Sequence, residues 1–304
     1  MSASVGVALY PDDGQTPDDI LKNADSAMYA AKRSGRNCSS FFENTLQAEA
    51  YEKMILTNSL RRALEREELT LQFQPKVSLP DKKITGFEAL LRWNSAEHGP
   101  VSPFKFIPFA EQSGLIVPIG EWVIKEAGHF ARQLDDQGLK DLHVAVNISP
   151  RQLSEEHFID IVRDTIQANS IAPEQLEFEV TESVLMETME ESIQKLIELR
   201  TLGVGIALDD FGTGYSSLTY LRRLPVDTLK VDKSFIDGIL GDEVQADLVG
   251  AIIDMAHTLN LTVVAEGVES EAQAEKLHQY HCDCIQGYVF SRPVHEASAL
   301  ALLQ

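Results

Sequence analysis

The chain has 304 residues, and its composition and charge exclude several classes of protein. Hydrophobic residues make up 44% of the sequence, which is enough to bury a sizeable core and excludes wholesale disorder. Lys and Arg number 26 against 47 Asp and Glu, so the formal net charge is −21 and a polymer of phosphates would be repelled. A small phosphate ligand is compatible with this charge if metal ions neutralise carboxylates locally.

Membrane segments and structural disulfides are not expected. No apolar run approaches the roughly 20 residues needed to span a bilayer, and no secretory signal is visible. The three cysteines (Cys38, Cys282 and Cys284) are too few for a disulfide framework. We therefore expect a soluble, cytoplasmic chain that contacts no membrane and binds no nucleic-acid polymer. His281 beside the last two cysteines could bind a soft metal, but ordinary packing is the favoured interpretation.

The N-terminal part predicts a strand, a turn, a helix and a second short strand. Residues 2–9 alternate toward an apolar face, and residues 11–14 (Pro-Asp-Asp-Gly) are typical of a turn. Thr16 followed by Pro17 is typical of a helix N-terminus, and apolar residues then recur at every third or fourth position. Because so few elements cannot enclose a core, we expect a partial α+β segment that belongs to a larger domain.

From about residue 69, short apolar strands alternate with amphipathic helices, as in a (β/α)8 barrel. The predicted strands are 71–77, 86–91, 143–148, 176–180, 204–208, 228–231, 262–265 and 285–290. The predicted helices are 104–133, 154–169, 186–202, 216–223, 244–259 and 270–280. The connection 78–85 is too short for a crossover helix, so the first two strands should form an antiparallel hairpin. The sequence therefore predicts an α/β fold, a TIM-like (β/α)8 barrel with one irregular first strand.

Polar residues fall at or near the C-terminal ends of six consecutive predicted strands, from the second to the seventh. One such residue is usually a solvated rim position. Six at one end of a barrel call for a chemical explanation, because those ends converge on the active-site face. The polar residues on these strands are Glu88, Arg92, Asn147, Glu179, Glu182, Asp209, Asp210, Lys230 and Glu266, and Gln286 lies on the eighth strand.

These side chains are suited to metal-assisted phosphodiester hydrolysis. Without metal, the carboxylates would repel one another by about 1–4 kcal/mol per close pair. Two ions about 3.5–4 Å apart are a common solution for this reaction, and Asp209 could bridge them. Lys230 could orient the attacking water, and Arg92 is suited to holding the phosphate. The set that offers only oxygen ligands, which favours Mg²⁺ or Mn²⁺ over zinc, is Glu88, Asn147, Glu179, Asp209, Asp210 and Glu266.

Around these residues the sequence resembles the EAL family of cyclic di-GMP phosphodiesterases over about residues 59–304. The resemblance starts at Glu88-Ala89-Leu90 and extends to seven further blocks in the family's order. Those blocks are Phe73-Gln74-Pro75, Asn147-Ile148-Ser149, Glu179-Val180-Thr181-Glu182, the loop that opens with Asp209-Asp210-Phe211-Gly212, Lys230-Val231-Asp232, Glu266-Gly267-Val268-Glu269 and Gln286-Gly287-Tyr288.

The resemblance implies an activity in bacterial second-messenger signalling. The family hydrolyses cyclic di-GMP to the linear dinucleotide 5′-pGpG with a water activated by Mg²⁺ or Mn²⁺, and we expect two ions. The family often dimerises near the 209–218 loop, so a homodimer through the barrel is expected as well.

The resemblance also implies a role for each matching residue. Glu88, Asn147, Glu179 and Asp209 would bind the first metal, Asp209 and Asp210 the second, and Glu266 would be a ligand or general base. Lys230 would bind the attacking water, Gln74, Leu91, Arg92 and Gln286 would contact the dinucleotide, and Glu182 would anchor the 209–218 loop. Lys230, Glu266 and Glu88 are thus the expected catalytic residues.

The N-terminal part resembles the end of a GGDEF, or diguanylate cyclase, domain at residues 4–8 and 24–32. The catalytic Gly-Gly-Asp-Glu-Phe loop does not occur in the chain, so no cyclase activity is expected. We expect a piece of a longer sensor protein, which could be membrane-anchored at full length. The expected division is a GGDEF-like fragment at 1–46, a helical linker at 47–58 and the EAL domain at 59–304.

Two other functions stay open. A catalytically silent receptor would bind cyclic di-GMP and release it intact, although such family members usually lack a metal ligand and this chain has them all. The same barrel and metals could also act on another phosphodiester, since a fold alone does not fix a substrate. Recovery of the intact ligand identifies the first case, and competition among cyclic nucleotides identifies the second.

Overall fold

The computed structural model describes residues 3–33, 37–42, 44–182, 189–212 and 221–303, and the chain divides into two compact units at residues 66 and 67. Among the described residues, no helix has both the length and the apolar character needed to cross a bilayer.

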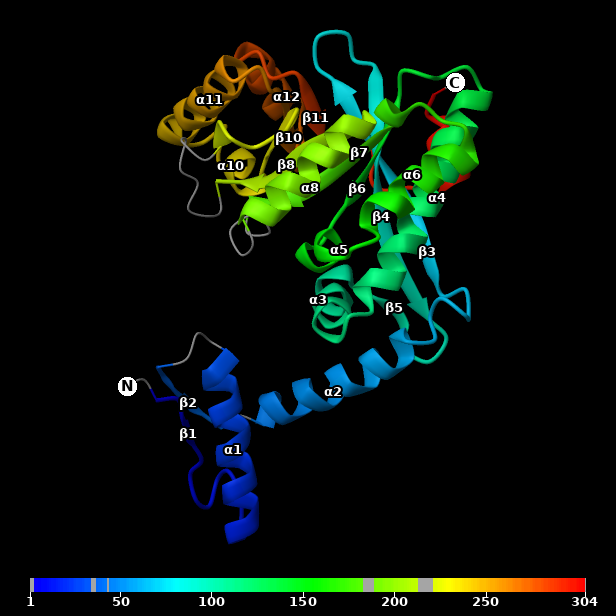
Figure 1. Ribbon diagram of the computed structural model, residues 1–304. Coiled ribbons are helices and arrows are strands. Elements are labelled where there is room, and N and C mark those ends of the chain that lie inside the picture. Colours follow the sequence, from blue (N-terminus) through cyan, green and yellow to red (C-terminus); the bar gives the residue numbers. More distant parts are fainter. Residues whose placement is uncertain (1–2, 34–36, 43, 183–188, 213–220, 304) are drawn as a thin grey trace. The chain divides into compact units, whose positions relative to one another are not determined.

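The first unit contains a small parallel strand pair with a crossover helix (Figure 1). Strand β1 (Val5–Val7) pairs with β2 (Ser39–Phe41), and α1 (Pro17–Arg33) connects them. Gly6 is required where β1 meets α1, because a Cβ there would lie 2.0 Å from the carbonyl oxygen of Ala24. The predicted order of strand, helix and strand is confirmed, and helix α2 (Asn44–Leu60) follows.

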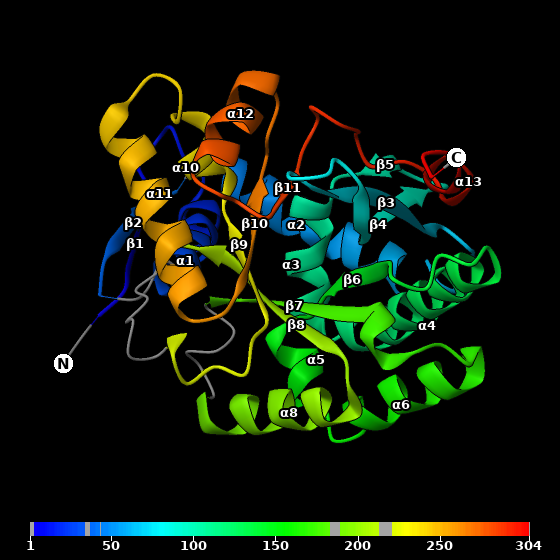
Figure 2. The same ribbon diagram turned by 90° about the horizontal axis from the view of Figure 1, so that it is seen from above.

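The second unit is a closed barrel of eight strands within the described residues, with one extra strand at its side (Figures 1 and 2). Its strands are β3 (Leu69–Ser78), β4 (Ile84–Ser95), β6 (His143–Asn147), β7 (Leu176–Thr181), β8 (Gly205–Phe211), β9 (Thr228–Val231), β10 (Thr262–Glu266) and β11 (Cys284–Gln286). β3 runs antiparallel to both of its neighbours, β4 and β11, and closes the barrel between them. The remaining barrel pairs are parallel. The predicted barrel with an irregular first strand is confirmed.

The outer faces of the strands are apolar and pack against helices. Phe73 of β3 stacks on Phe130 of helix α4 (Ile116–Asp136) with ring centroids 3.9 Å apart, and Phe87 of β4 meets the same ring edge-on at 5.5 Å. The other helices around the barrel are α3 (Pro103–Ser113), α5 (Pro150–Ser154), α6 (Phe158–Asn169), α8 (Met189–Leu202), α10 (Lys233–Asp237), α11 (Glu243–Thr258), α12 (Glu271–Gln279) and α13 (Glu296–Ala301).

Several predicted element boundaries were wrong. The helix predicted over 104–133 is two helices, because Gly114 adopts a left-handed φ of 82° that ends α3. The strand predicted over 285–290 ends at Gln286, where Gly287 packs so closely on Val268 that a Cβ would lie 2.0 Å from its carbonyl oxygen. Strand β5 (Gly99–Val101), which pairs with the end of β4, was not predicted. Most of the helix predicted over 216–223 lies outside the described residues.

The aromatic contact between the barrel and α4 should dominate local stability. We expect Phe130→Ala to lower the free energy of unfolding of the barrel unit by about 3–5 kcal/mol, because the buried ring leaves a cavity against Phe73 and Phe87. Urea unfolding followed by circular dichroism measures this change. Phe104→Ala removes the same atoms from a side chain that is 95% exposed and should change the free energy by less than about 0.5 kcal/mol. Equal effects of the two substitutions would contradict this assignment of the core.

Candidate functional site

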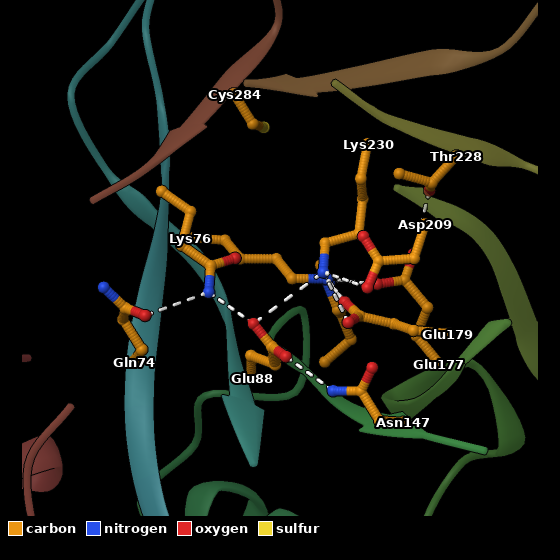
Figure 3. Close-up of polar contacts among 12 residues, drawn as sticks. Gln74, Lys76, Glu88, Asn147, Glu177, Glu179, Asp209, Thr228, Lys230 and Cys284 are labelled. Atoms are coloured by element: carbon orange, nitrogen blue, oxygen red, sulfur yellow. Dashed lines mark hydrogen bonds and ion pairs between the residues drawn. The ribbon is translucent and has the colours of Figure 1, made fainter. Parts of the chain in front are cut away.

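One face of each barrel strand points toward the barrel interior, and the strand register aligns the polar side chains on these faces. Side chains two residues apart share a face of a strand, and directly paired residues on neighbouring strands share it too. Gln74 pairs with Glu88, Asn147 with Glu179, and Glu266 with Gln286. The sequence predicted Glu88, Asn147, Glu179 and Glu266 at or near strand ends and Gln286 on the last strand, and it indicated Gln74 through the family resemblance. The register brings them together in the barrel interior, where Figure 3 shows Gln74, Glu88, Asn147 and Glu179.

Lys230 lies at the centre of this cluster and is 0% exposed. Its Nζ lies 2.5 Å from Glu179 Oε2, 2.7 Å from Glu266 Oε1, 3.2 Å from Asp209 Oδ2 and 3.8 Å from Glu88 Oε2. These four carboxylates come from four different strands, β7, β10, β8 and β4. One ammonium group therefore holds together side chains from half of the barrel's strands.

A second buried lysine lies one layer below the cluster. Lys76 on β3 is 1% exposed, and its Nζ lies 2.5 Å from Glu177 Oε2 and 2.8 Å from Glu179 Oε1. Glu177 also accepts a hydrogen bond from Thr228 Oγ1 at 2.8 Å. Glu179 therefore contacts a lysine on each of its oxygens, Lys230 on one side and Lys76 on the other (Figure 3).

Two amides hold the Glu88 carboxylate. Asn147 Nδ2 donates to Glu88 Oε1 at 2.6 Å, and Gln286 Nε2 donates to Glu88 Oε2 at 2.5 Å and to Gln74 Oε1 at 3.2 Å. Gln286 Oε1 is buried and has no hydrogen-bond partner among the described residues. A buried acceptor of this kind is a potential contact for a ligand N–H group.

Burial and the two lysines divide the carboxylates into two groups. Burial raises the pKa of Glu88 to about 7 and that of Glu266 to about 8, and neighbouring carboxylates add to both shifts. Burial would also raise the pKa of Glu179, but its ion pairs with Lys230 and Lys76 outweigh that effect and lower it. Burial opposes the charge of Lys230, yet the facing carboxylates, Glu179 foremost, raise its pKa well above the usual value.

Asp209, Asp210 and Glu266 can present oxygens that all lie within 4.8 Å of one another, and they form the one three-residue group suited to an ion among the described residues. Consecutive strand residues normally point to opposite faces. Asp210 departs from this rule because it has a left-handed φ of 56° beside a register shift between Leu208 and Phe211. Burial, with Asp209 next in importance, raises the pKa of Asp210.

The donor set fits divalent cations. Among the described residues, six carboxyl groups lie in or beside the cluster with the two lysines, so four negative charges are unbalanced when all six are ionised, as metal ligands must be. Two divalent cations would balance this excess with four positive charges. Carboxylate oxygens with one amide oxygen are ligands that Mg²⁺ and Mn²⁺ prefer. The six carboxylates are Glu88, Glu177, Glu179, Asp209, Asp210 and Glu266.

Two pockets flank the cluster and divide the predicted substrate-binding residues between them. Gln74 and Gln286 line a pocket of about 320 Å³ that also contains Glu88 and Glu266. The second pocket, of about 480 Å³, is lined by Leu91 and the half-buried Arg92. It reaches Asn147 and Asp210, and apolar residues of α3 and α4 form much of its wall. Burial lowers the pKa of Arg92, whose Nε donates to Gln72 Oε1 at 2.8 Å.

Glu182 is placed at the end of β7, but its predicted role as a loop anchor stays a prediction. Its side chain is 4% exposed, and neither carboxylate oxygen has a hydrogen-bond partner among the described residues. Residues 213–220 of the loop that it was predicted to hold lie outside those residues.

Sequence reasoning missed three residues of the site. Lys76 and Glu177 lie two positions from Gln74 and Glu179, so strand alternation alone would have placed them on the same interior face. Phe104, in the first turn of α3, lines both pockets together with Leu90. Its exposure had no signal in the sequence, because an apolar residue in the first turn of an amphipathic helix usually packs.

The cysteines behave as packing residues. Cys282 is 1% exposed, and its Sγ lies 3.3 Å from the carbonyl oxygen of Cys284. Cys284 Sγ lies 3.8 Å from Thr85 Oγ1. Burial raises the pKa of both thiols.

Thiol labelling tests this burial. In the native protein we expect only Cys38, which is partly exposed, to react promptly with an excess of a maleimide. Cys282 and Cys284 should react only after denaturation, because the thiolate is the nucleophile and burial disfavours it. Intact-mass spectrometry counts the labelled thiols over time. Prompt labelling of more than one thiol in the native state would contradict the described packing.

Fold and site together define a TIM-like barrel protein with an acidic cluster at the carboxyl ends of its strands. The chain belongs to the EAL domain family, whose pattern matches residues 57–293, and residues 1–38 match the GGDEF domain of diguanylate cyclases. Both resemblances seen in the sequence are thereby confirmed.

Individual relatives agree with this assignment. The chain is 48% identical over 301 residues to the bifunctional diguanylate cyclase/cyclic di-GMP phosphodiesterase MucR of Pseudomonas aeruginosa, covering 99% of this chain and 44% of MucR. It is 44% identical over 294 residues to the cyclic di-GMP phosphodiesterase NbdA of the same species, covering 97% of this chain and 38% of NbdA. The chain thus spans less than half the length of these curated relatives.

A solved structure shows the same fold. The structure of PaMucR phosphodiesterase in a c-di-GMP complex superposes with a TM-score of 0.77 at 46% identity, over 81% of this chain and 99% of that one.

Proposed function

We propose that this chain hydrolyses cyclic di-GMP to linear 5′-pGpG in a reaction that depends on Mg²⁺ or Mn²⁺. The observation that carries the proposal is the interior cluster of six carboxyl groups and two lysines, which has four excess negative charges when all six carboxyls are ionised, enough to balance two divalent cations. The cyclic di-GMP phosphodiesterases MucR and NbdA support the choice of substrate.

The proposed metal site uses residues that already lie together. Bound divalent cations would lower the pKa of a water ligand and so supply a nucleophile at neutral pH. Asp209, Asp210 and Glu266 would hold one side of the site, since their oxygens lie within 4.8 Å of one another. Glu88, Asn147 and Glu179 would hold the other side, each fixed by a neighbour within 2.8 Å.

The remaining residues bind and orient. Lys230, which contacts Glu179 and Glu266 and is fully buried, would orient the attacking water and stabilise charge on phosphoryl oxygens. Gln286 Oε1, a buried acceptor with no partner among the described residues, would accept a hydrogen bond from a guanine N–H. Arg92 would hold a phosphate.

A product assay tests this function. Chromatography of cyclic di-GMP incubated with the protein should show 5′-pGpG in Mg²⁺ or Mn²⁺ and intact substrate in EDTA. The alternative of a silent receptor predicts tight binding and intact ligand under all three conditions, which would sink the proposal. Competition with other cyclic nucleotides tests the third possibility: the weakest inhibition should come from those that lack guanine.

A substitution at the centre of the cluster tests the mechanism. Glu88→Gln keeps the shape of the side chain but removes a carboxylate from the site, and we expect kcat to fall by at least about 10²-fold. The same assay at saturating Mn²⁺ measures this fall. Glu126→Gln makes the same chemical change on the exposed face of α4 and should leave kcat unchanged. A Glu88→Gln variant with the parent rate and an unchanged fold would refute the assigned role.

A homodimer through the barrel, a cytoplasmic location and the domain limits 1–46, 47–58 and 59–304 stay predictions. Sedimentation of the purified chain with and without cyclic di-GMP would test the first of them.

A further inference from the structure

The proposed function counts Lys76 only as a positive charge beside Glu179, although it is among the most deeply buried side chains of the barrel. It is 1% exposed, lies on β3, and donates to Glu177 and Glu179 on β7 at 2.5 and 2.8 Å. In Figure 3 its chain extends across the barrel interior, and its amine ends beside that of Lys230, where both approach the Glu179 carboxylate.

Stability does not account for this lysine. Interior layers of (β/α)8 barrels are dominated by bulky branched residues. Replacing a buried ion pair with apolar side chains of similar volume is often neutral or stabilising, because desolvation of two charges offsets their attraction. The Lys76–Glu177 pair is therefore better explained by its effect on Glu179, which lies in the next layer toward the carboxyl ends of the strands.

The geometry of Glu179 shows what that effect is. Its Oε1 lies 2.8 Å from Lys76 Nζ, and its Oε2 lies 2.5 Å from Lys230 Nζ. A carboxylate held at only one oxygen can rotate about its last bond, whereas one held at both oxygens cannot. Because Lys76 occupies Oε1 from below, Oε2 is turned toward Lys230, which also contacts Asp209.

Glu177 and Thr228 hold Lys76 in place. Glu177 Oε2 lies 2.5 Å from Lys76 Nζ, and Glu177 Oε1 accepts a hydrogen bond from Thr228 Oγ1 at 2.8 Å. The Glu177 carboxylate is therefore also held at both oxygens. The chain of contacts runs from Thr228 on β9 through Glu177 to Lys76 on β3 and back to Glu179 on β7. It crosses the barrel and ends on a carboxylate of the cluster.

We propose that Lys76 is a positioning residue that fixes the orientation of the Glu179 carboxylate for divalent-cation binding, with Glu177 as its counter-ion. This inference rests on the metal dependence proposed above. Outer partners that orient a metal ligand typically contribute about 10- to 100-fold in metal affinity or activity.

Binding of Mn²⁺ in the absence of substrate tests the inference, by titration calorimetry and by the electron paramagnetic resonance signal of free Mn²⁺. The main variant is Lys76→Met/Glu177→Gln, which removes one positive and one negative charge and so preserves the net charge of the interior. Its matched control is Glu177→Gln alone, which leaves Lys76 on Glu179. Thermal unfolding confirms that each protein is folded at the temperature of the titration.

We expect the double variant to bind Mn²⁺ about 10- to 100-fold more weakly than wild-type protein, which has the same net charge, and also more weakly than the Glu177→Gln control. Equal affinities of the double variant and the control would overturn the role of Lys76, even if the double variant melts at a lower temperature. Wild-type protein that binds no Mn²⁺ would overturn the proposed function as well, so the two failures are distinguishable.

The single variant Lys76→Met provides a second test, because charge and position predict opposite results. Loss of a positive charge near a cation site strengthens cation binding by electrostatics alone. Loss of an orienting contact weakens it. We expect weaker Mn²⁺ binding, and tighter binding would show that Lys76 acts only through its charge and would overturn the inference.

Discussion

The structure depends on neutralising acidic side chains inside a closed barrel. A buried carboxylate cannot stay ionised without a partner, and Lys230 supplies one to four carboxylates from four strands. The strands can close around this interior only if their side chains also satisfy one another's charges. Closure of the barrel therefore brings the polar side chains of the site together.

The neutralisation is incomplete, and the remainder is chemically useful. Glu179, between two lysines, has a lowered pKa, whereas burial raises the pKa of Glu88 to about 7 and of Glu266 to about 8. Without cations these two carboxyls retain protons near neutral pH, and a bound cation would release those protons because metal ligands must be deprotonated. The same excess of carboxylates would give the site its proposed affinity for divalent ions.

Backbone geometry extends the set of ligands beyond what regular strands provide. Asp209 and Asp210 are consecutive, and in a regular strand their side chains would point to opposite faces. The register shift on β8 and the left-handed φ of Asp210 bring both side chains within reach of Glu266. Such a conformation is uncommon for a residue other than glycine and persists where the surroundings enforce it, often at functional sites.

Much of the fold and of the site could be predicted because hydrophobic alternation is a local signal. The strands and their polar C-terminal ends followed from it, and residues such as Glu88 and Lys230 were named before their neighbours were known. The break at Gly114 and the end of β11 depend on tertiary contacts, so the continued apolar pattern concealed them. Strand alternation would have placed Lys76 and Glu177 on the interior face, but their pairing could not be predicted, because they lie 101 residues apart and only the register of the closed barrel brings them together.

The two pockets bear on how such a site would treat a symmetric ligand. A cyclic dinucleotide with identical halves offers the same base at both ends, but the pockets that flank the cluster differ. One is lined by Glu88, Lys233, Glu266 and Glu269, and the other is walled largely by apolar residues of α3 and α4. Leu90 and Phe104 line both, so a molecule that spans the cluster would pass these two side chains. On the proposed function, an asymmetric site would present one of the two equivalent phosphodiesters to the carboxylate cluster and would leave the other outside it. Cleavage would then stop at a linear dinucleotide, since a second cut requires the product to leave and rebind in the opposite orientation.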